Sequence, residues 1–241
     1  MADLFISDLH LSSERPDICR AFFHFLNTKA RDAENLYILG DLTEAWVGDD
    51  DPDPLTRQIV AALRAVHEGG TGVFFQHGNR DFLVGQTFAM ESGTTLLPDY
   101  HVLDRGGHRI LLCHGDTLCS DDKSYQRFRC IVRSRLFLWW LKNRSLAKRQ
   151  DIAKRLRTRS QLANSNKASN IMDVNEDTVA RTMRRFQADI LIHGHTHRPA
   201  THEYDERRRI VLGDWDTFGW YASLSDGNVA LHRFAFEHQN I

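Results

Sequence analysis

Five short apolar segments of this chain each end in a cluster of polar residues. Short runs rich in β-branched residues are typical of strands that are covered on both faces. The last run, 188–192, leads into His193-Gly194-His195-Thr196-His197, where three imidazoles fall within five residues. Ligands of α/β sheets bind at the carboxyl ends of the strands, so the five clusters are expected to meet there. The clusters are Asp8 and His10, Asp41, Asn79 and Arg80, His114, and His195 and His197.

Predicted strands and helices alternate along most of the chain, which favours the α/β class. Strands are predicted at 2–7, 35–39, 71–76, 108–113 and 188–192, with shorter extended pieces near 96 and at 101–104. Helices are predicted at 16–30, 54–66, 84–92 and 176–187, the last of them capped by Asn175. The tail at 210–236 reads as further strands. The chain has no repeat, linker or low-complexity tract, so we predict a single domain over residues 1–241.

A basic insert interrupts this pattern at about residues 121–170. Between Lys123 and Lys167 lie fourteen of the chain's 31 Lys and Arg residues and one acidic residue, Asp151. The apolar residues of its first part recur at helical spacing, which predicts a helix whose apolar stripe packs into the core. The stripe consists of Tyr125, Phe128, Val132, Leu136 and Trp139.

Two features of the insert go beyond ordinary helix packing. Residues 136–141 are apolar all round and have Arg and Lys on both sides. A second helix is predicted from about Ser145, and on it Ser160, Asn164 and Lys167 follow the spacing i, i+4, i+7. They share one polar face, which either is simply solvated or contacts a ligand.

Cysteine content and hydropathy restrict where the protein can work. The four cysteines show no CxxC spacing, which indicates reduced thiols in a cytosolic protein. The first residues lack the basic and apolar regions of a signal peptide. No apolar run approaches the ~18–20 residues of a membrane-spanning helix. We expect a soluble or peripheral protein.

The polar clusters combine carboxylates, imidazoles and one amide oxygen, without a thiolate. This mixture suits Mn²⁺, Fe²⁺ or Zn²⁺ in a reactive site rather than a structural zinc. Seven candidate ligands are too many for one tetrahedral ion and fit two ions that act together on a phosphoryl group. On an extended segment, His195 and His197 are two residues apart and would point the same way. The seven candidates are Asp8, His10, Asp41, Asn79, His114, His195 and His197.

The order of these clusters resembles the signature of the calcineurin-like metallophosphoesterases. That signature reads D-x-H, GD, GN[HR]D, H and GHTH, and here it stands at 8–10, 40–41, 78–81, 114 and 194–197. The resemblance implies an α/β fold with four layers, an α-β-β-α sandwich, to which the insert adds a helical cap. It also implies Asp41 as a bridging carboxylate between two ions. The remaining ligands would be Asp8, His10 and His197 on one ion, and Asn79, His114 and His195 on the other.

Position 80 is Arg where many relatives carry a catalytic His. A guanidinium cannot serve as a general acid at neutral pH, but it can clamp a phosphoryl oxygen. With Arg80 and the basic insert, the chain resembles one branch of the family. That branch acts on a lipid-linked UDP-sugar, UDP-2,3-diacylglucosamine, in lipid A biosynthesis.

That resemblance implies cleavage of the pyrophosphate to UMP and 2,3-diacylglucosamine 1-phosphate, with two Mn²⁺ and a water that attacks the uridine-side phosphorus. It implies catalytic roles for Asn79, Arg80 and His195, and a location on the cytoplasmic face of the bacterial inner membrane. The implied substrate contacts are Asn79, Arg80, Asp122, Ser160, Asn164, Lys167 and His195.

Two other functions stay open at this point. The chain could be another dinuclear-metal phosphodiesterase or a nuclease of the same superfamily, because basic helices with Trp can hold phosphates and stack bases. The aliphatic residues at 136–141 fit acyl chains better than bases, so no nucleic-acid partner is predicted. A non-catalytic membrane-surface protein is the second alternative, and the complete ligand set argues against it. No protein partner is predicted.

Overall fold

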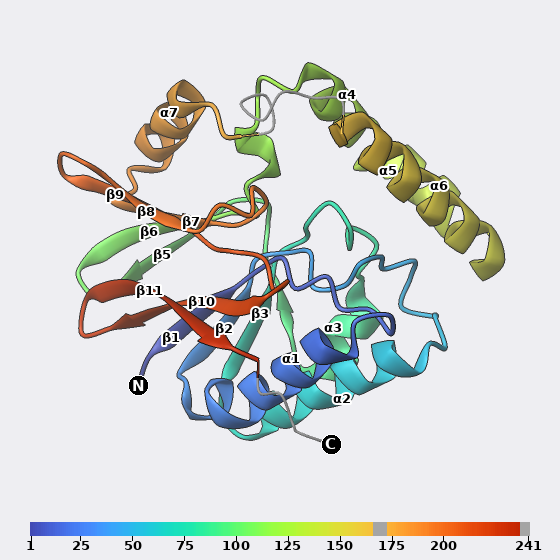
Figure 1. The fold of residues 1–241 in the computed structure, drawn as a ribbon, viewed down its shortest axis with the longest axis horizontal. Coiled ribbons are helices and arrows are strands. Elements are labelled where there is room, and N and C mark those ends of the chain that lie inside the picture. The colour runs from blue at the N-terminus through green and yellow to red at the C-terminus, as the bar shows by residue number, and fades with distance from the viewer. Residues whose placement is uncertain (166–172, 237–241) are drawn as a thin grey trace.

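Two β-sheets lie face to face in the middle of the molecule, and helices cover both outer faces (Figure 1). The computed structural model describes residues 1–165 and 173–236, and the side chains of these residues except 159–165. The first sheet has the order β11 (Asn228–Ala235), β10 (Phe218–Ser225), β1 (Asp3–Ile6), β2 (Asn35–Ile38), β3 (Gly72–Phe75) and β4 (Thr95–Leu96). The second has the order β5 (His101–Arg105), β6 (His108–Leu112), β7 (Ile190–His193), β9 (Arg207–Val211) and β8 (Ala200–Tyr204).

The strands that precede the polar clusters form the centre of each sheet. β1, β2 and β3 pair in parallel, as do β6, β7 and β9, so their carboxyl ends lie at one edge. The five strands predicted before the clusters are all present, with ends that differ by one or two residues. The strand β8 was not predicted, because its alternating half-exposed residues give no apolar run.

Three apolar layers hold the four structural layers together. Helices α1 (Pro16–Thr28), α2 (Pro54–Glu68) and α3 (Gln86–Ser92) pack on the first sheet through side chains such as Phe22 and Leu63. Phe5 points between the sheets, whereas its neighbours Leu4 and Ile6 point to the helices, as alternation along a strand requires. This is the predicted four-layer α-β-β-α arrangement.

The fourth layer is α7 (Glu176–Phe186), which covers the outer face of the second sheet. Val179 and Met183 pack there against Leu191 of β7. The predicted N-cap of α7 is present, because Asn175 Oδ1 accepts a hydrogen bond of 2.9 Å from the Thr178 backbone N–H. A side chain that satisfies an otherwise unpaired N–H fixes where the helix begins.

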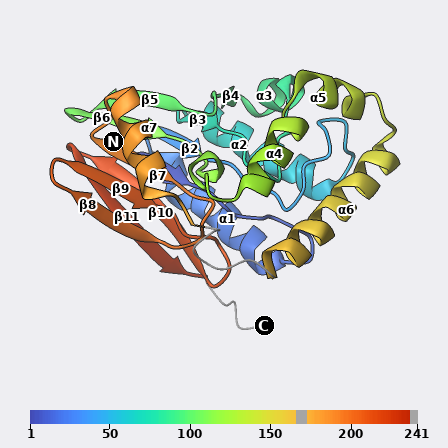
Figure 2. The same ribbon diagram turned by 90° about the horizontal axis from the view of Figure 1, so that it is seen from above.

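The insert forms three helices that extend to one side of the sheets (Figures 1 and 2). They are α4 (Lys123–Val132), α5 (Arg135–Lys142) and α6 (Leu146–Ser165). The predicted continuous stripe is wrong, since the chain turns at Arg133 and Ser134 caps a new helix by accepting from Phe137 N at 3.3 Å. Val132 is buried as expected, but Leu136 and Trp139 are 81% and 68% exposed.

The structure also bears on the cysteines and on membrane crossing. All four cysteines are free thiols, three of them buried and Cys130 exposed, as their spacing indicated. Over residues 1–165 and 173–236, no helix combines the length and the apolar character needed to span a bilayer.

Candidate metal centre

The five polar clusters come together at the carboxyl ends of β1, β2, β3, β6 and β7. Backbone hydrogen bonds join their loops: Asp8 N donates to Gly40 O at 3.1 Å, and His10 N to Asp41 O at 3.0 Å. The two sheets are joined at the same place, because His195 N, after β7 of the second sheet, donates to Asp8 Oδ2, after β1 of the first, at 2.8 Å. The sequence prediction that these clusters meet is therefore confirmed as geometry.

One group of candidate ligands consists of Asp8, His10 and His197, whose ligand atoms all lie within 4.8 Å of one another. His197 Nε2 is 3.3 Å from Asp8 Oδ1, and the rings of His10 and His197 are 5.4 Å apart. Such distances leave room for one cation between a carboxylate and two imidazoles.

A second group lies beside the first and consists of Asp8, Asp41 and His114. Asp41 stands between two imidazoles, with Oδ2 3.8 Å from His10 Nε2 and Oδ1 3.8 Å from His114 Nε2. His114 Nε2 is also 3.1 Å from Asn79 Oδ1. Asp8 belongs to both groups, whereas the sequence analysis gave the shared position to Asp41 alone.

The His195 side chain lies beside the second group of candidate ligands. Its ring lies 5.0 Å from that of His114, whereas His197 faces His10. The predicted extended segment is wrong here, because His195 and His197 have φ values of 69° and 55°, in the left-handed region. The two imidazoles consequently lie beside different candidate ligands, His195 beside His114 and His197 beside His10.

The left-handed conformation recurs at other candidate ligands. Asp8, His10 and Asp41 have φ values of 55°, 49° and 53°. Non-glycine residues adopt this region rarely and at a cost, although Asp and His tolerate it better than most. The hydrogen bonds between the loops hold the backbone in this conformation, which turns each ligand toward the centre directly after its strand.

Several buried polar atoms of the centre have no hydrogen-bond partner among the described residues, namely Asp8 Oδ1 and both ring nitrogens of His10. Burial lowers the pKa of His197, but Asp214 and Asp8 outweigh burial and raise it to about 10. Burial also acts to lower the pKa of His114, but the charges of Asp41 and Asp8 outweigh burial, so this pKa is raised. The site thus favours positive charge. It also offers oxygen and nitrogen atoms without hydrogen-bond partners that could coordinate divalent cations.

Comparison with known proteins agrees with this geometry. Residues 4–199 match the sequence profile of a family described as calcineurin-like phosphoesterase. The chain belongs to this family. The predicted family and fold class are therefore confirmed, and the chain has two groups of residues that could hold a metal ion.

Relatives and a solved structure extend the comparison. A UDP-2,3-diacylglucosamine hydrolase of Pseudomonas paraeruginosa is 54% identical over 224 residues, which cover 91% of this chain and 93% of that one. A protein of the same name from Escherichia coli is 50% identical over 244 residues, covering 98% and 100%. The structure of an archaeal phosphodiesterase superposes with a TM-score of 0.52 at 12% identity, covering 98% of this chain and 99% of that one, which shows a shared fold.

Sequence reasoning missed the residues that support the calcineurin-like centre. Asp81 is buried and accepts from Leu42 N at 2.8 Å and Gly78 N at 2.7 Å, so it ties the Asp41 loop to the Asn79 loop. Burial and the nearby Asp41 raise its pKa to about 7. Its place as the last residue of the Gly-Asn-Arg-Asp motif was the available signal.

Two further carboxylates stand behind candidate histidines. Glu44 Oε2 lies 3.4 Å from His10 Nδ1, and Asp214 Oδ2 lies 3.4 Å from His197 Nδ1. Carboxylates in this position orient imidazole ligands and raise their basicity. Asp214 follows Gly213 after β9, the same Gly-Asp pattern as Gly40-Asp41, which the sequence analysis overlooked.

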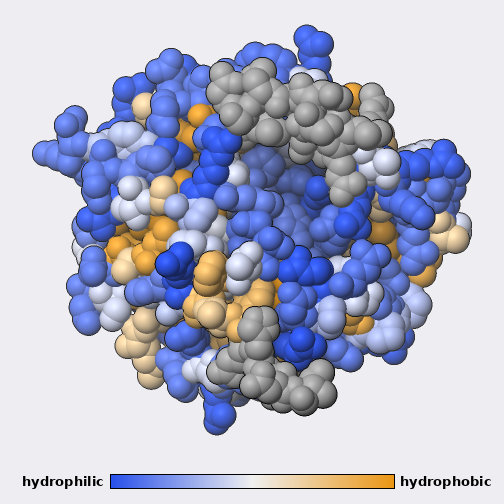
Figure 3. Space-filling view, in the orientation of Figure 1, coloured by the Kyte–Doolittle hydropathy of each residue, from blue (hydrophilic) through white to orange (hydrophobic). Residues whose placement is uncertain are grey.

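A pocket of about 260 Å³ opens over the centre, and four of the predicted substrate contacts line it, namely Asn79, Arg80, Asp122 and His195. Figure 3 shows a recess whose interior is lined mainly by hydrophilic residues. Ser160 and Asn164 lie in the part of α6, residues 159–165, whose side chains are not described, and Lys167 lies outside the described residues. Asp122 also caps α4, since Oδ1 accepts from Tyr125 N at 3.0 Å.

Replacing Asp41 by Asn should weaken Mn²⁺ binding in both halves of the centre, because each half faces one of its oxygens. We expect an affinity loss of at least ~10–100-fold, the effect known for loss of one supporting group around a metal. Isothermal titration of metal-free protein measures it. Asp104→Asn, at an exposed position of β5, is the control. Unchanged stoichiometry and affinity in the Asp41 variant would contradict the assignment.

Proposed function

We propose that this chain hydrolyses the pyrophosphate bond of UDP-2,3-diacylglucosamine, a step of lipid A biosynthesis, and releases UMP and 2,3-diacylglucosamine 1-phosphate. One observation carries the proposal. Clustered carboxylate and imidazole candidate ligands lie in a phosphoesterase-family chain that is 54% and 50% identical, over nearly its whole length, to proteins named UDP-2,3-diacylglucosamine hydrolase.

The proposed cofactor is a pair of Mn²⁺ ions. Asp8, His10 and His197 would hold one ion, and Asn79, His114 and His195 the other. The shared ligand would be Asp41, whose two oxygens face His10 and His114 at 3.8 Å each. Ions at such a centre supply a nucleophilic water at neutral pH and polarise phosphoryl oxygens.

Arg80 and His195 have the properties needed to handle the phosphoryl group. Arg80 N donates to Asp41 Oδ1 at 2.8 Å, which fixes the residue beside the centre, and its Nε has no hydrogen-bond partner among the described residues. A guanidinium there can bind two phosphoryl oxygens at once. Burial, with a smaller effect of His114, lowers the pKa of His195 to about 4, so its imidazole is neutral at pH 7.

The three insert helices form the proposed cap over the lipid end of the substrate, within a single domain of residues 1–241. Asp122 lines the pocket at the start of α4, and Ser160, Asn164 and Lys167 are the further contacts proposed from the sequence. The leaving group, a sugar phosphate with two acyl chains, would lie on this side.

Exposed apolar side chains on α4 and α5 support contact with a membrane surface. Ile131, Leu136 and Trp139 are exposed, with Arg135 and Lys142 close by in the sequence. We place the protein peripherally on the cytoplasmic face of the inner membrane, where a lipid-linked substrate lies. Leu138 packs on the core and Trp140 lies under Arg144, 4.7 Å from ring centroid to guanidinium carbon, so Leu136 and Trp139 are the better lipid contacts.

The proposed reaction predicts that UMP is released from UDP-2,3-diacylglucosamine in the presence of Mn²⁺ and that a chelator stops its release. UDP-N-acetylglucosamine and single-stranded DNA, offered under the same conditions, test the unacylated-nucleotide and nuclease alternatives. Chromatography of the products measures all three. Faster cleavage of DNA than of the lipid substrate would show that the chain is a nuclease instead.

Arg80→Ala should lower kcat by ~10²–10³, as loss of one preorganised electrostatic donor does. Arg80→Lys should restore only part of the rate, since an ammonium lacks the two-pronged geometry. Steady-state kinetics with Mn²⁺ titration separates the rate from metal binding, and Arg57→Ala, exposed on α2, is the control. A normal kcat with a raised KM would make Arg80 a binding residue only.

The double substitution of Leu136 and Trp139 by Ser should weaken binding to vesicles of phosphatidylethanolamine and phosphatidylglycerol by ~10-fold or more, given ~1.5–3 kcal/mol for each large apolar side chain fully buried. Sedimentation with the vesicles measures it. Met90→Ser on α3 is a control at 68% exposure. Equal vesicle binding of the double variant and wild type would remove the membrane role from α5.

A further inference from the structure

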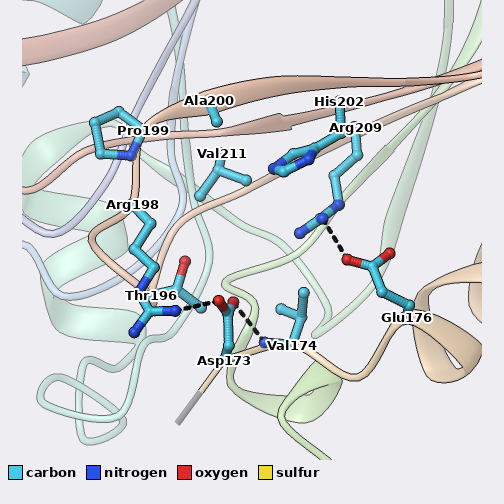
Figure 4. A pocket seen from close by; sticks show the side chains of 10 residues that line it. All are labelled: Asp173, Val174, Glu176, Thr196, Arg198, Pro199, Ala200, His202, Arg209 and Val211. Carbon is cyan, nitrogen blue, oxygen red and sulfur yellow. Dashed lines mark hydrogen bonds and ion pairs between the residues drawn. The ribbon is translucent and has the colours of Figure 1, made fainter. Parts of the chain in front are cut away.

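A second cavity, of about 530 Å³, lies beside the metal centre on the outer face of the second sheet (Figure 4). It shares Thr196 and Arg198 with the pocket over the centre, so the two spaces adjoin. Its volume falls within the ~300–1,000 Å³ of typical small-molecule sites. The roles assigned above to the metal ligands and the cap leave this cavity without an occupant.

The register of β8 and β9 builds the floor of the cavity. Ala200 is paired with Val211, and His202 with Arg209, so these four side chains lie on one face of the two strands. This face is turned toward α7. Arg209 of β9 also pairs with Leu191 of the neighbouring strand β7, and Leu191 packs against α7.

The charged wall of the cavity is held rigidly. Arg209 is buried, and it donates to Glu176 Oε1 at 2.7 Å and to Tyr204 Oη at 2.9 Å. Tyr204 in turn donates to Glu176 Oε2 at 2.8 Å. Figure 4 shows the guanidinium and the His202 ring directed into the space between β8, β9 and the start of α7.

The remaining lining supplies two kinds of contact. Pro199, Ala200 and Val211 present apolar surface, and the His202 ring is flat. Burial and then the charge of Arg209 lower the pKa of His202, so the ring is neutral at pH 7. A neutral ring can stack on a base, while Arg209 can donate to carbonyl oxygens and Glu176 can accept from N–H or hydroxyl groups. A pyrimidine nucleoside carries each of these features.

The position of the cavity agrees with the direction of the reaction. Figures 1 and 2 both place α7 on one side of the molecule and the cap helices α5 and α6 on the other. In an in-line displacement the leaving group departs on one side of the phosphorus, and here the cap takes it. The retained nucleoside needs space away from the cap, and the cavity under α7 lies there. Its charged lining does not suit acyl chains.

We infer that the cavity lined by His202, Arg209 and Glu176 binds the uridine half of the substrate. This inference rests on the function proposed above. Arg198 stands at the boundary of the two spaces, ion-paired to Asp173, where the phosphate of a bound nucleotide would pass from the cavity to the metal centre.

The test compares UMP with ribose 5-phosphate, which lacks the base, as ligands of the Mn²⁺-loaded protein in isothermal titration. Wild type should bind UMP about 10-fold or more tightly, the gain expected from stacking one base. Ala200→Phe fills the cavity and His202→Ala removes its ring, and either should abolish most of this preference. Thr201→Phe is the matched control, because Thr201 is exposed on the opposite face of β8. Thermal melting checks that each variant is folded.

Equal binding of UMP and ribose 5-phosphate by wild type would overturn the inference, as would a preference kept by both folded variants. Kinetics separate this result from the proposed function. In the variants, kcat/KM for UDP-2,3-diacylglucosamine should fall relative to that for bis(p-nitrophenyl) phosphate. A wild type that prefers UMP through this cavity but does not cleave the lipid substrate would refute the proposed function and leave the nucleoside site standing.

Discussion

The buried carboxylate of Asp8 joins the two sheets, and the centre depends on that junction. Asp8 Oδ2 accepts from Ser7 Oγ at 2.6 Å and from His195 N at 2.8 Å, which links β1 of the first sheet to the loop after β7 of the second. The approach is so close that a Cβ on Gly194 would stand 2.0 Å from Asp8 Oδ2. A Cβ on Gly78 would likewise stand 2.1 Å from Asp41 Oδ1. These glycines are required because the loops must approach the carboxylates.

This constraint explains which parts of the site the sequence could predict. Strand-forming runs and the residues directly after them are local features, so the meeting of Asp8, Asp41 and His114 followed from topology alone. The opposite directions of His195 and His197 depend on left-handed φ values that only the junction of two sheets enforces. Likewise, Asp214 becomes a partner of His197 only through tertiary packing. The same limit applies to the turn between α4 and α5, which local spacing of apolar residues does not reveal.

The distribution of charge supports the proposed placement of the substrate. Asp8 and Asp41 make the centre favourable for cations, while the insert adjoining it is strongly basic. Under α7 the charges of Arg209 and Glu176 are already paired, so that cavity offers directed hydrogen bonds rather than net charge. A substrate with a phosphoryl centre, an apolar tail and a neutral base would meet a matching surface at each point.

The cap is also tied to the centre by side chains that reach from α6 to the loop after β2. Arg149 donates to Val47 O at 2.7 Å and pairs with Asp50, and it fits only because Gly48 has no side chain in its path. About two turns further along α6, Arg157 Nε lies 2.9 Å from Glu44 Oε1, and the other oxygen of Glu44 is 3.4 Å from His10 Nδ1. A displacement of α6 would therefore move Glu44, and with it the carboxylate that orients His10. A second link joins the insert to the loop that carries Asn79, because Arg133 at the end of α4 donates to Gly78 O at 2.7 Å.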